Sequence, residues 1–291
     1  MRKECVFIDV FTGIPYAGNQ LAVFPDGRDL STAQMQKIAN EINYSETTFI
    51  LGADGITADF LIRIFTPQQE LPFAGHPTLG AAYSIINILD IWAEKKDTLR
   101  LKTNVGIIPL RKERDAIWMV QNEPEFYLQH ADKKEIADLF DLSADDIADD
   151  LPVEEVSTGN SVLIIPIKTL DAMQRAQGNV TNIKNFFGGK SAGPYLFSLE
   201  TTRSHAKVHT RFFAPHMGIL EDPATGSAAG PLVGYLLEHR VFGEEFEIVN
   251  EQGIEMGRPS EILMRGTTRQ GKYLIQIGGQ CAYVGRGEFD I

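Results

Sequence analysis

The sequence predicts an α+β protein made of two similar halves, each a set of strands with one central apolar helix. Segments with strand-like hydrophobic patterns recur along all 291 residues, while only a few segments have helical periodicity. Two segments combine small residues with a nearly continuous apolar character, which is typical of a buried helix: residues 79–91, and the small residues after Ser227 that run into the apolar stretch 231–237. We expect the halves at residues 1–117 and 118–279, with a strand at residues 280–291 returning to the first half.

Three motifs of the first half recur in the same order in the second half. The matched pairs are Arg-Ile-Phe-Thr-Pro at 63–67 with Arg-Phe-Phe-Ala-Pro at 211–215, Thr-Leu-Gly-Ala-Ala at 78–82 with Thr-Gly-Ser-Ala-Ala at 225–229, and Gly-Asn at 18–19 with Gly-Asn at 159–160. An ordered repeat indicates an internal duplication. We therefore expect the helices that begin near Thr78 and Thr225 to occupy equivalent places, and the cleft between the halves to be the default binding site.

In the first half, strands alternate with two helices. Ser31 is a plausible N-cap for a helix over residues 32–42, whose apolar residues recur at helical spacing. Glu46 falls where the loop after this helix enters a strand at residues 47–51. The other strands of this half are predicted at residues 4–11, 21–24, 56–65, 98–102, 106–111 and 117–120.

The second half begins with an expected linker at residues 122–126. An acidic stretch at 133–150 then carries one or two amphipathic surface helices. On a strand, His205 and His209 lie on one face of a sheet, so we favour structural roles for them over a metal pair. The remaining elements are strands within 153–167, a helix at 169–177, a loop at 188–194, and strands at 195–199, 205–213, 245–250, 262–266, 273–278 and 280–285.

Composition and charge limit the classes of function. Hydrophobic residues make up 43% of the chain and charged residues 23%, as in a globular protein with an ample core. The net charge of −12 argues against a nucleic acid or an anionic membrane as a partner. We expect no signal peptide, since the first apolar run is short and is interrupted by Asp9, and no membrane span. Cys5 and Cys281 provide neither a disulfide framework nor a zinc cluster, so we predict a cytoplasmic enzyme without a metal.

The segment at residues 218–230 concentrates candidate chemistry. Adjacent carboxylates, Glu221 and Asp222, precede a proline and then Thr225-Gly226-Ser227, a pattern typical of a loop that ends at a helix start, with Thr225 or Ser227 as the cap. Backbone N–H groups at a helix start bind anions. A carboxylate beside them suggests acid–base chemistry on an anionic substrate. The alternative is an ordinary capped helix that packs closely through Ala and Gly.

Four motifs together resemble the PhzF family, named for a phenazine-biosynthesis isomerase. They are Gly-Asn at 18–19, Ser-Glu-Thr-Thr-Phe at 45–49, Ala-Gly-His-Pro-Thr at 74–78 and Glu-Asp-Pro-Ala-Thr-Gly-Ser-Ala at 221–228. The resemblance spans essentially the whole chain. It implies a diaminopimelate epimerase-like fold, in which each half is a curved, mostly antiparallel sheet wrapped around a central helix. It also implies a homodimer with a biosynthetic role.

The resemblance also assigns roles to single residues. It implies that Glu46 is the acid–base residue and that His76 and Asp222 act beside it in catalysis. The founding member of the family isomerises trans-2,3-dihydro-3-hydroxyanthranilate by moving a proton without a cofactor, so a small anionic metabolite is the expected ligand. The substrate-binding residues that follow from the resemblance are Asn19, Ser45, Gly75, Gly226 and Ser227.

The implied chemistry agrees with the residue types. A proton shift between carbons needs one group that takes the proton and returns it, and burial in an apolar cleft would raise the pKa of the Glu46 carboxyl toward the working range. Backbone N–H groups can stabilise the developing negative charge. A surface glutamate, a helix-start histidine and a carboxylate that only stabilises a helix start are the plain alternatives for Glu46, His76 and Asp222. Glu221 is expected to be structural.

Two other functions are compatible with the sequence. An amino-acid racemase or epimerase on the same fold would use two thiols, one at each helix start. Neither Cys5 nor Cys281 lies in either motif, which disfavours that chemistry. A non-catalytic protein that binds small anions is the third possibility, and the presence of Glu46, His76 and Asp222 argues against it.

Overall fold

The computed structural model describes residues 1–52, 57–89, 98–189 and 192–291. The described chain forms two compact units: unit 1 comprises Met1–Val120 and Gly278–Ile291, and unit 2 comprises Gln121–Ile277. The expected boundaries, 117/118 and 279/280, differ slightly from these, because strand β8 (Ala116–Val120) stays whole in unit 1 and the second boundary falls within strand β17 (Lys272–Gly279). Both units combine strands with a few helices, so the α+β prediction is confirmed.

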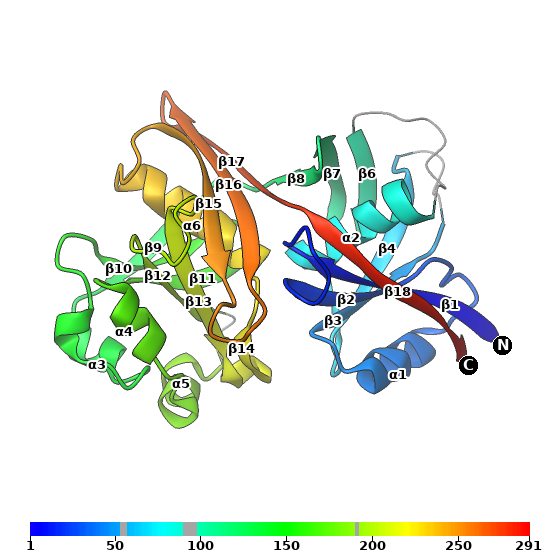
Figure 1. The fold of residues 1–291 in the computed structure, drawn as a ribbon, viewed down its shortest axis with the longest axis horizontal. Helices are drawn as coiled ribbons and strands as arrows, with labels where there is room; N and C mark the ends of the chain where they lie inside the picture. The colour runs from blue at the N-terminus through cyan, green and yellow to red at the C-terminus, as the bar shows by residue number, and fades with distance from the viewer. Residues whose placement is uncertain (53–56, 90–97, 190–191) are drawn as a thin grey trace. The chain divides into compact units, whose positions relative to one another are not determined.

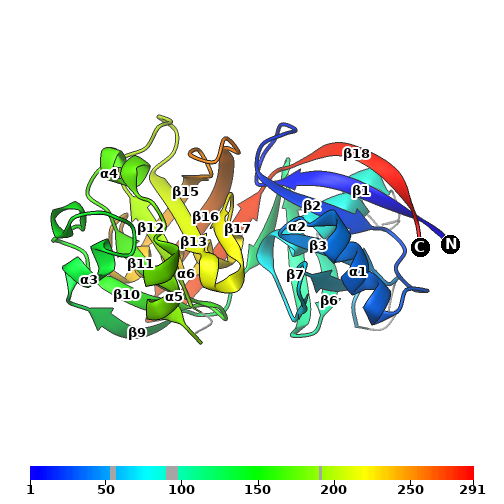
Figure 2. The same cartoon turned by 90° about the horizontal axis from the view of Figure 1, so that it is seen from below.

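Unit 1 is a mixed sheet that is mostly antiparallel. Strand β18 at the end of the chain pairs with β1 over Arg2–Val10, and the two strands run side by side in Figure 2. Pairs β2·β3 and β4·β6 are parallel, and β1·β2, β3·β4, β4·β5, β6·β7 and β7·β8 are antiparallel. The strands are β1 Arg2–Val10, β2 Asn19–Phe24, β3 Glu46–Ile50, β4 Phe60–Phe65, β5 Glu70–Leu71, β6 Thr98–Thr103, β7 Gly106–Glu113, β8 Ala116–Val120 and β18 Cys281–Asp290.

Helix α2 (Gly75–Tyr83) is the central helix of unit 1. Its residues from Gly75 to Ala82 are all buried, and it contacts β1, β2, β3, β6 and β8 (Figure 1). A Cβ atom added at Gly80 would lie 2.5 Å from Leu21 Cδ2, so the absence of a side chain at this position lets the helix approach β2 closely. A π-helix over Ser84–Ile88 continues α2.

Helix α1 (Thr32–Ile42) is capped as the sequence predicts. The Ser31 side chain accepts from Gln34 N, and the Gln34 side chain accepts from Ser31 N, which forms a capping box. Asn43 then ends the helix in the left-handed conformation, with φ of 55°. The buried face of α1, with Met35, Ile38 and Ala39, joins a core cluster with aromatic residues of β2, β3 and β4.

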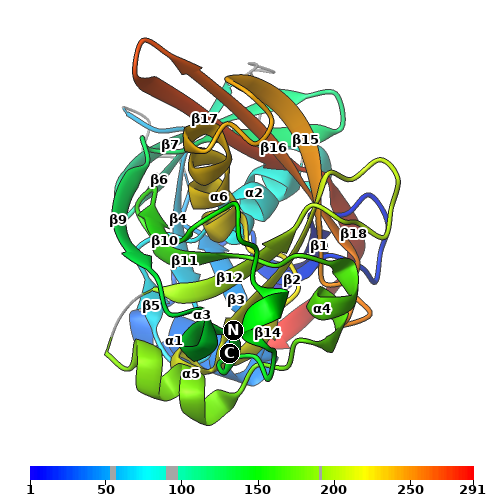
Figure 3. The ribbon, with the colours of Figure 1, turned by 90° about the vertical axis from the view of Figure 1, so that its left-hand side faces the viewer.

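Unit 2 has the same kind of sheet around helix α6 (Gly226–Glu238), which is buried almost throughout and contacts β10, β11 and β16 (Figure 3). Three further helices, α3 (Lys133–Ala137), α4 (Leu170–Arg175) and α5 (Val180–Phe187), cover a second core. Two 3₁₀ helices lie at Ala144–Asp146 (η2) and Pro215–Met217 (η3). The strands are β9 Glu125–His130, β10 Val153–Ser157, β11 Ser161–Pro166, β12 Gly193–Ser198, β13 Val208–Ala214, β14 Ile219–Asp222, β15 Glu245–Gln252, β16 Ser260–Arg269 and β17 Lys272–Gly279.

The strand pairing of the two units confirms the internal duplication. Strands β1 to β5 pair in the order antiparallel, parallel, antiparallel, antiparallel, and β10 to β14 do the same. The crossovers through the central helices are also equivalent, because β4·β6 and β13·β15 are both parallel. The repeated arginines, Arg63 and Arg211, each make a bidentate ion pair, with Glu70 and Glu221 respectively.

The expected alignment of the two helix starts is wrong by one turn. Helix α2 begins at Gly75 after Ala74, and α6 begins at Gly226 after Thr225, so Thr225 corresponds to Ala74 and not to Thr78. The second half carries additional residues around the 3₁₀ helix η3 between β13 and β14, which shifts the repeat. Pro77 did not delay the start of α2, because a proline is tolerated in the first turn of a helix.

Some other sequence-based assignments also need correction. The expected linker at 122–126 overlaps strand β9, which begins at Glu125 and pairs with β10. Helix α5 was not expected, although Asn179 caps it by accepting from Asn182 N. Strand β13 begins at Val208 and so excludes His205. Parts of the strand expected at 56–65, the helix at 79–91 and the loop at 188–194 lie outside the described residues.

Candidate active site

In unit 1, the fold brings three of the predicted site residues together. Asn19 opens β2, Glu46 opens β3, and His76 lies in the first turn of α2. The parallel pairing of β2 with β3, in which Leu21 lies opposite Glu46, places both strand starts at the same end of the sheet. His76 Nε2 lies 3.4 Å from Glu46 Oε2, and Asn19 Nδ2 lies 3.5 Å from His76 Nδ1. All three side chains are buried.

The charge state of His76 follows from its burial. Burial lowers the pKa of His76 to about 3, and a hydrogen bond with the backbone of Gln20 opposes this only partly. The imidazole is therefore neutral near pH 7. Although the distance between His76 and Glu46 is within the range of an ion pair, the contact joins a carboxyl group to a neutral ring. His76 Nε2 and Glu46 Oε2 lie against each other without a hydrogen bond between them, and the neutral ring supplies no full positive charge to the carboxyl group.

The start of α2 lies directly beside these residues. Its cap residue, Ala74, makes no side-chain hydrogen bond to the helix, so the N–H groups of the first turn at Gly75 and His76 receive no side-chain cap from it. The partial positive charge of a helix start favours an anion at this place. Ser45, which precedes β3, is half-buried.

Unit 2 presents a second helix start with a carboxylate. Asp222 ends β14 and is buried, while Gly226 and Ser227 are the first two residues of α6. The Thr225 hydroxyl donates to Asp222 Oδ2 at 2.5 Å. The sequence suggested Thr225 or Ser227 as a side-chain cap of α6. Thr225 is the N-cap residue, but no side chain makes a capping hydrogen bond, because the Thr225 hydroxyl donates to Asp222.

The position of Glu46 has a counterpart in unit 2 that lacks an acid. Leu21 lies opposite Glu46 in the pair β2·β3, and Val162 lies opposite Gly193 in the equivalent pair β11·β12. A Cβ atom added at Gly193 would lie 2.8 Å from the ring of Phe212, so this position has no room for a glutamate side chain. The duplication therefore supplies one glutamate at this position, in unit 1.

Sequence reasoning missed Gln252, which is fully buried at the end of β15. Its Nε2 donates to Asp222 O at 2.8 Å and to Thr225 Oγ1 at 3.0 Å. The strand registers identify the residue of unit 1 that corresponds to it, because β4·β6 pairs Phe60 with Leu101 and β13·β15 pairs Val208 with Asn250. This register matches Gln252 with the short Thr103 of unit 1.

The other candidate groups have structural partners. Glu221 pairs with Arg211, in agreement with its expected structural role. His209 is buried between Glu251 and Glu255, with ring-to-carboxyl distances of 2.8 Å and 3.1 Å. Among the described residues, no group of three His, Cys, Asp or Glu side chains could hold a metal ion.

Neither of the two thiols has the properties of a reactive cysteine. Cys5 lies in β1 and Cys281 opens β18, and both are buried and free. Burial raises the pKa of Cys5 to about 12 and also raises that of Cys281, so both remain protonated near pH 7.

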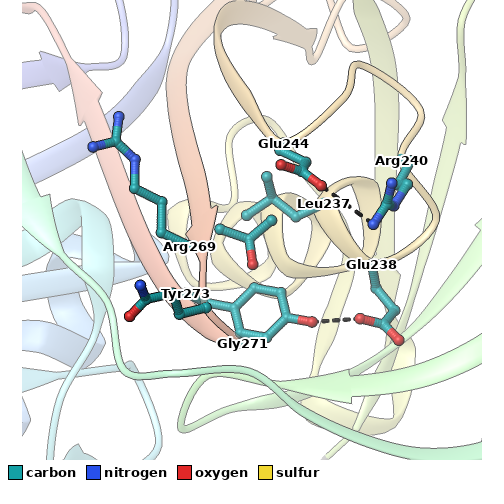
Figure 4. A pocket seen from close by; sticks show the side chains of 9 residues that line it. Leu237, Glu238, Arg240, Glu244, Arg269, Gly271 and Tyr273 are labelled. Atoms are coloured by element: carbon teal, nitrogen blue, oxygen red, sulfur yellow. Dashed lines mark hydrogen bonds and ion pairs between the residues drawn. The ribbon is translucent and has the colours of Figure 1, made fainter.

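A surface pocket of about 710 Å³ lies in unit 2, between the end of α6 and the turn that joins β16 to β17 (Figure 4). Its charged side chains are partly paired, as in the contact of Arg240 with Glu244 at 3.2 Å. None of the predicted site residues lines it. In the part of the chain that the structure describes, no helix is both long and apolar enough to cross a membrane.

Comparison with known proteins agrees with the geometry. Residues 8–287 match the PhzC-PhzF family model, described as phenazine biosynthesis-like protein. The chain is 36% identical to trans-2,3-dihydro-3-hydroxyanthranilate isomerase of Pseudomonas fluorescens, with 97% of each chain covered. A crystal structure of a PhzF-family phenazine biosynthesis protein from Bacillus anthracis matches with a TM-score of 0.90 and 30% identity, over 100% of both chains.

A more distant structure shows how widely the fold occurs. A hydroxyproline epimerase from Agrobacterium vitis matches with a TM-score of 0.59 and 10% identity, covering 99% of this chain and 92% of the epimerase. At this identity the match concerns the fold alone, which supports the expected epimerase-like architecture. Together, the full-length family match and the identity to a named isomerase show that this chain is an isomerase of the PhzC-PhzF family.

Proposed function

We propose that the protein is a cofactor-independent isomerase that moves a proton on a small carboxylate-bearing substrate, with Glu46 as the general acid and base. The observation that carries this proposal is the buried contact of Glu46 with His76 beside the uncapped start of α2. The neutral imidazole packs against the carboxyl group, and the helix start provides N–H groups for a substrate carboxylate. A proton-transfer catalyst requires a carboxyl group that is both held in place and in the correct protonation state.

The reaction needs no redox step. The Glu46 carboxylate takes a proton from a substrate carbon, and the electron pair of that C–H bond moves into the π system of the substrate. The resulting carboxylic acid then returns the proton to a different carbon of the same π system. Backbone N–H groups stabilise the negative charge that develops between the two transfers. The substrate leaves with the same atoms and the same oxidation state.

We further propose that His76 and Asp222 complete the catalytic set and that Asn19, Ser45, Gly75, Gly226 and Ser227 bind the substrate. Burial of Asn19 and Asp222, and the position of the glycines at the first residue of each central helix, support these assignments. A homodimer and a cytoplasmic location remain predictions, and sedimentation of the purified protein tests the former.

The first compound to test is trans-2,3-dihydro-3-hydroxyanthranilate, the substrate that names the relative from Pseudomonas fluorescens. The purified protein, without added cofactor and in the presence of EDTA, should convert this compound or a related cyclic amino carboxylate. In D₂O, solvent deuterium should appear at a substrate carbon when the held proton exchanges before its return. A panel of small carboxylates can be screened first by thermal shift, since a ligand at a hundred times its Kd adds about 2.7 kcal/mol of stability.

Two-thiol racemisation receives no support from the thiols of this chain. Both are protonated near pH 7 and lie on strands β1 and β18 instead of at the helix starts. A binding protein without catalysis would stabilise on addition of a carboxylate but would give neither product nor deuterium exchange. Product formation with deuterium exchange therefore separates a catalyst from a binding protein, and the identity of the product separates an isomerase from a racemase.

A further inference from the structure

A chain of buried hydrogen bonds runs through unit 2 and ends on Asp222. At its last links, Gln252 Nε2 donates to Thr225 Oγ1 at 3.0 Å, and the Thr225 hydroxyl donates to Asp222 Oδ2 at 2.5 Å. Gln252 Nε2 also donates to the backbone oxygen of Asp222 at 2.8 Å, and Gln252 Oε1 accepts from Thr225 N at 3.2 Å. One amide side chain therefore binds both ends of the turn that carries Asp222 into α6.

The direction of these bonds is determined by the groups themselves. The backbone oxygen of Asp222 can only accept, so the Gln252 atom facing it must be the NH₂ group. Since the same NH₂ group donates to Thr225 Oγ1, the single hydroxyl proton of Thr225 is available for Asp222. The Thr225 hydroxyl thus donates a hydrogen bond to Asp222. An ionised carboxylate accepts such a bond more strongly than a protonated carboxyl group does.

The opposite end of the chain fixes Gln252. Asn250 Nδ2 donates to the Tyr195 hydroxyl at 3.0 Å, and this hydroxyl lies 3.0 Å from Gln252 Oε1, to which it can donate. The Thr210 hydroxyl donates to Asn250 Oδ1 at 3.0 Å. Burial raises the pKa of Tyr195, so its hydroxyl keeps the proton that it donates. Each polar group in this sequence of bonds has a partner, as a buried polar network requires.

Among the residues that the structure describes in unit 1, the positions equivalent to Asn250, Gln252 and Tyr195 carry other side chains, although the strand pairing is the same. The strand registers place Leu101 at the position of Asn250 and Thr103 at that of Gln252. In unit 1, Thr48 pairs with Ile64, and in unit 2, Tyr195 pairs with Phe212 at the equivalent place. Thr48 therefore occupies the position of Tyr195. The network is therefore not needed to build this sheet around a helix. It is present in the unit that carries Asp222.

We propose that Gln252 and Thr225 are positioning residues for Asp222, and that they hold its carboxylate ionised and in one orientation for the reaction. This inference rests on the proposed function, in which Asp222 contacts the substrate. Thr225 touches Asp222 directly, and Gln252 acts through Thr225 and through the backbone of Asp222. Loss of one oriented hydrogen bond to a charged group corresponds to roughly a 10- to 100-fold effect.

The test compares Thr225→Val with Thr225→Ser in the full-length protein. Thr225→Val keeps the shape but removes the hydroxyl, and should lower kcat by roughly 10- to 100-fold and move the acid limb of the pH–rate profile to higher pH. Thr225→Ser restores the hydroxyl and should return both toward wild type, and Gln252→Met should resemble Thr225→Val. Wild-type kcat and an unchanged acid limb in Thr225→Val would overturn the proposal. Thr225→Ala replaces Thr225→Val if the latter does not fold.

A matched control is Thr169→Val, at the cap of α4 in the same unit. Thr169 accepts from Ala172 N, so this variant should lose stability but keep the wild-type kcat and pH profile. If the wild-type protein turns over none of the tested carboxylates, the proposed function fails while the positioning role is still measurable. A ¹³C titration of the Asp222 carboxyl group should then show a higher midpoint in Thr225→Val than in wild type, and equal midpoints would sink the inference.

Discussion

The two units have the same strand order and the same arginine–glutamate ion pair, but they bring different polar groups to the start of the central helix. Unit 1 has Glu46 beside the neutral ring of His76. Unit 2 has Gly193 at the position of Glu46 and holds Asp222 through a buried chain of hydrogen bonds. The duplicated arrangement of strands and central helix therefore determines where polar groups can meet the helix start, while a few side chains determine which chemistry each unit can supply.

The largest expected effect comes from the residue that only unit 1 supplies. Glu46→Gln keeps the size of the side chain but cannot exchange a proton, and should lower turnover by roughly 10²–10⁴-fold, the range typical of a lost general acid–base. Thermal unfolding and ligand affinity should stay nearly unchanged. Solvent deuterium incorporation into the substrate, measured by mass spectrometry, should disappear with turnover. Near-normal turnover in this variant would transfer the proton-transfer role to Asp222 or His76.

The repeated arginine–glutamate ion pairs provide a test of how alike the two duplicated units are. Arg211 is more buried than Arg63, and it also donates to the backbone oxygens of Met173 and Ala176, both at 2.7 Å. Arg211→Met should therefore cost about 3–5 kcal/mol of unfolding free energy, because it leaves Glu221 unpaired. Arg63→Met should cost about 1 kcal/mol, since its pair is better solvated. Urea denaturation measures both, and equal losses would contradict the comparison.

Each unit contains one buried histidine whose titration should affect stability, and the two effects have opposite sign. The pKa of His76 is lowered to about 3, so the unfolded chain binds the proton more tightly and the contribution of His76 is lost as pH falls from about 6.5 toward 3. Burial also opposes protonation of His209, but its hydrogen bonds with Glu255 and Glu251 outweigh burial and raise its pKa. The contribution of His209 to the free energy of unfolding is therefore present below about pH 6.5 and is lost as the pH rises through the pKa of His209 in the folded state.

These signs can be measured with His76→Gln and His209→Gln. The stability of wild type relative to His76→Gln should decrease as the pH is lowered below about 6.5, and relative to His209→Gln it should decrease as the pH is raised above about 6.5. Each unit of pKa difference corresponds to about 1.4 kcal/mol. Denaturation curves at several pH values test this, and two differences that change in the same direction would refute it.

The smallest effect is expected at the thiols. Cys5→Ala and Cys281→Ala remove side chains that are protonated and buried in strands of unit 1, so turnover should stay within about twofold of wild type while stability falls modestly. The double variant should still exchange solvent deuterium into the substrate. A large loss of turnover in a folded single variant would bring thiol chemistry back into consideration.

The sequence alone was sufficient to predict the main helices, strands and the internal duplication, because hydrophobic periodicity and local capping are short-range properties. Ser31 as a cap residue predicted the start of α1, and the Arg-x-Phe-x-Pro repeat identified the duplication. The motif at residues 45–49 placed Glu46 at the entry of a strand, where β3 begins. In contrast, the repeat was aligned one turn too late at Thr78, because additional residues around η3 change the spacing only in the second half.

Only the tertiary structure could decide which polar side chains meet. The close approach of His76 to Glu46 depends on parallel pairing of β2 with β3 and on the packing of α2 against them, and no local pattern records either. Likewise, Gln252 lies 27 residues from Thr225 in sequence, and their contact requires β15 to pair with β13. A sequence pattern specifies the face that a residue occupies, whereas long-range strand register determines the partner that the residue contacts there.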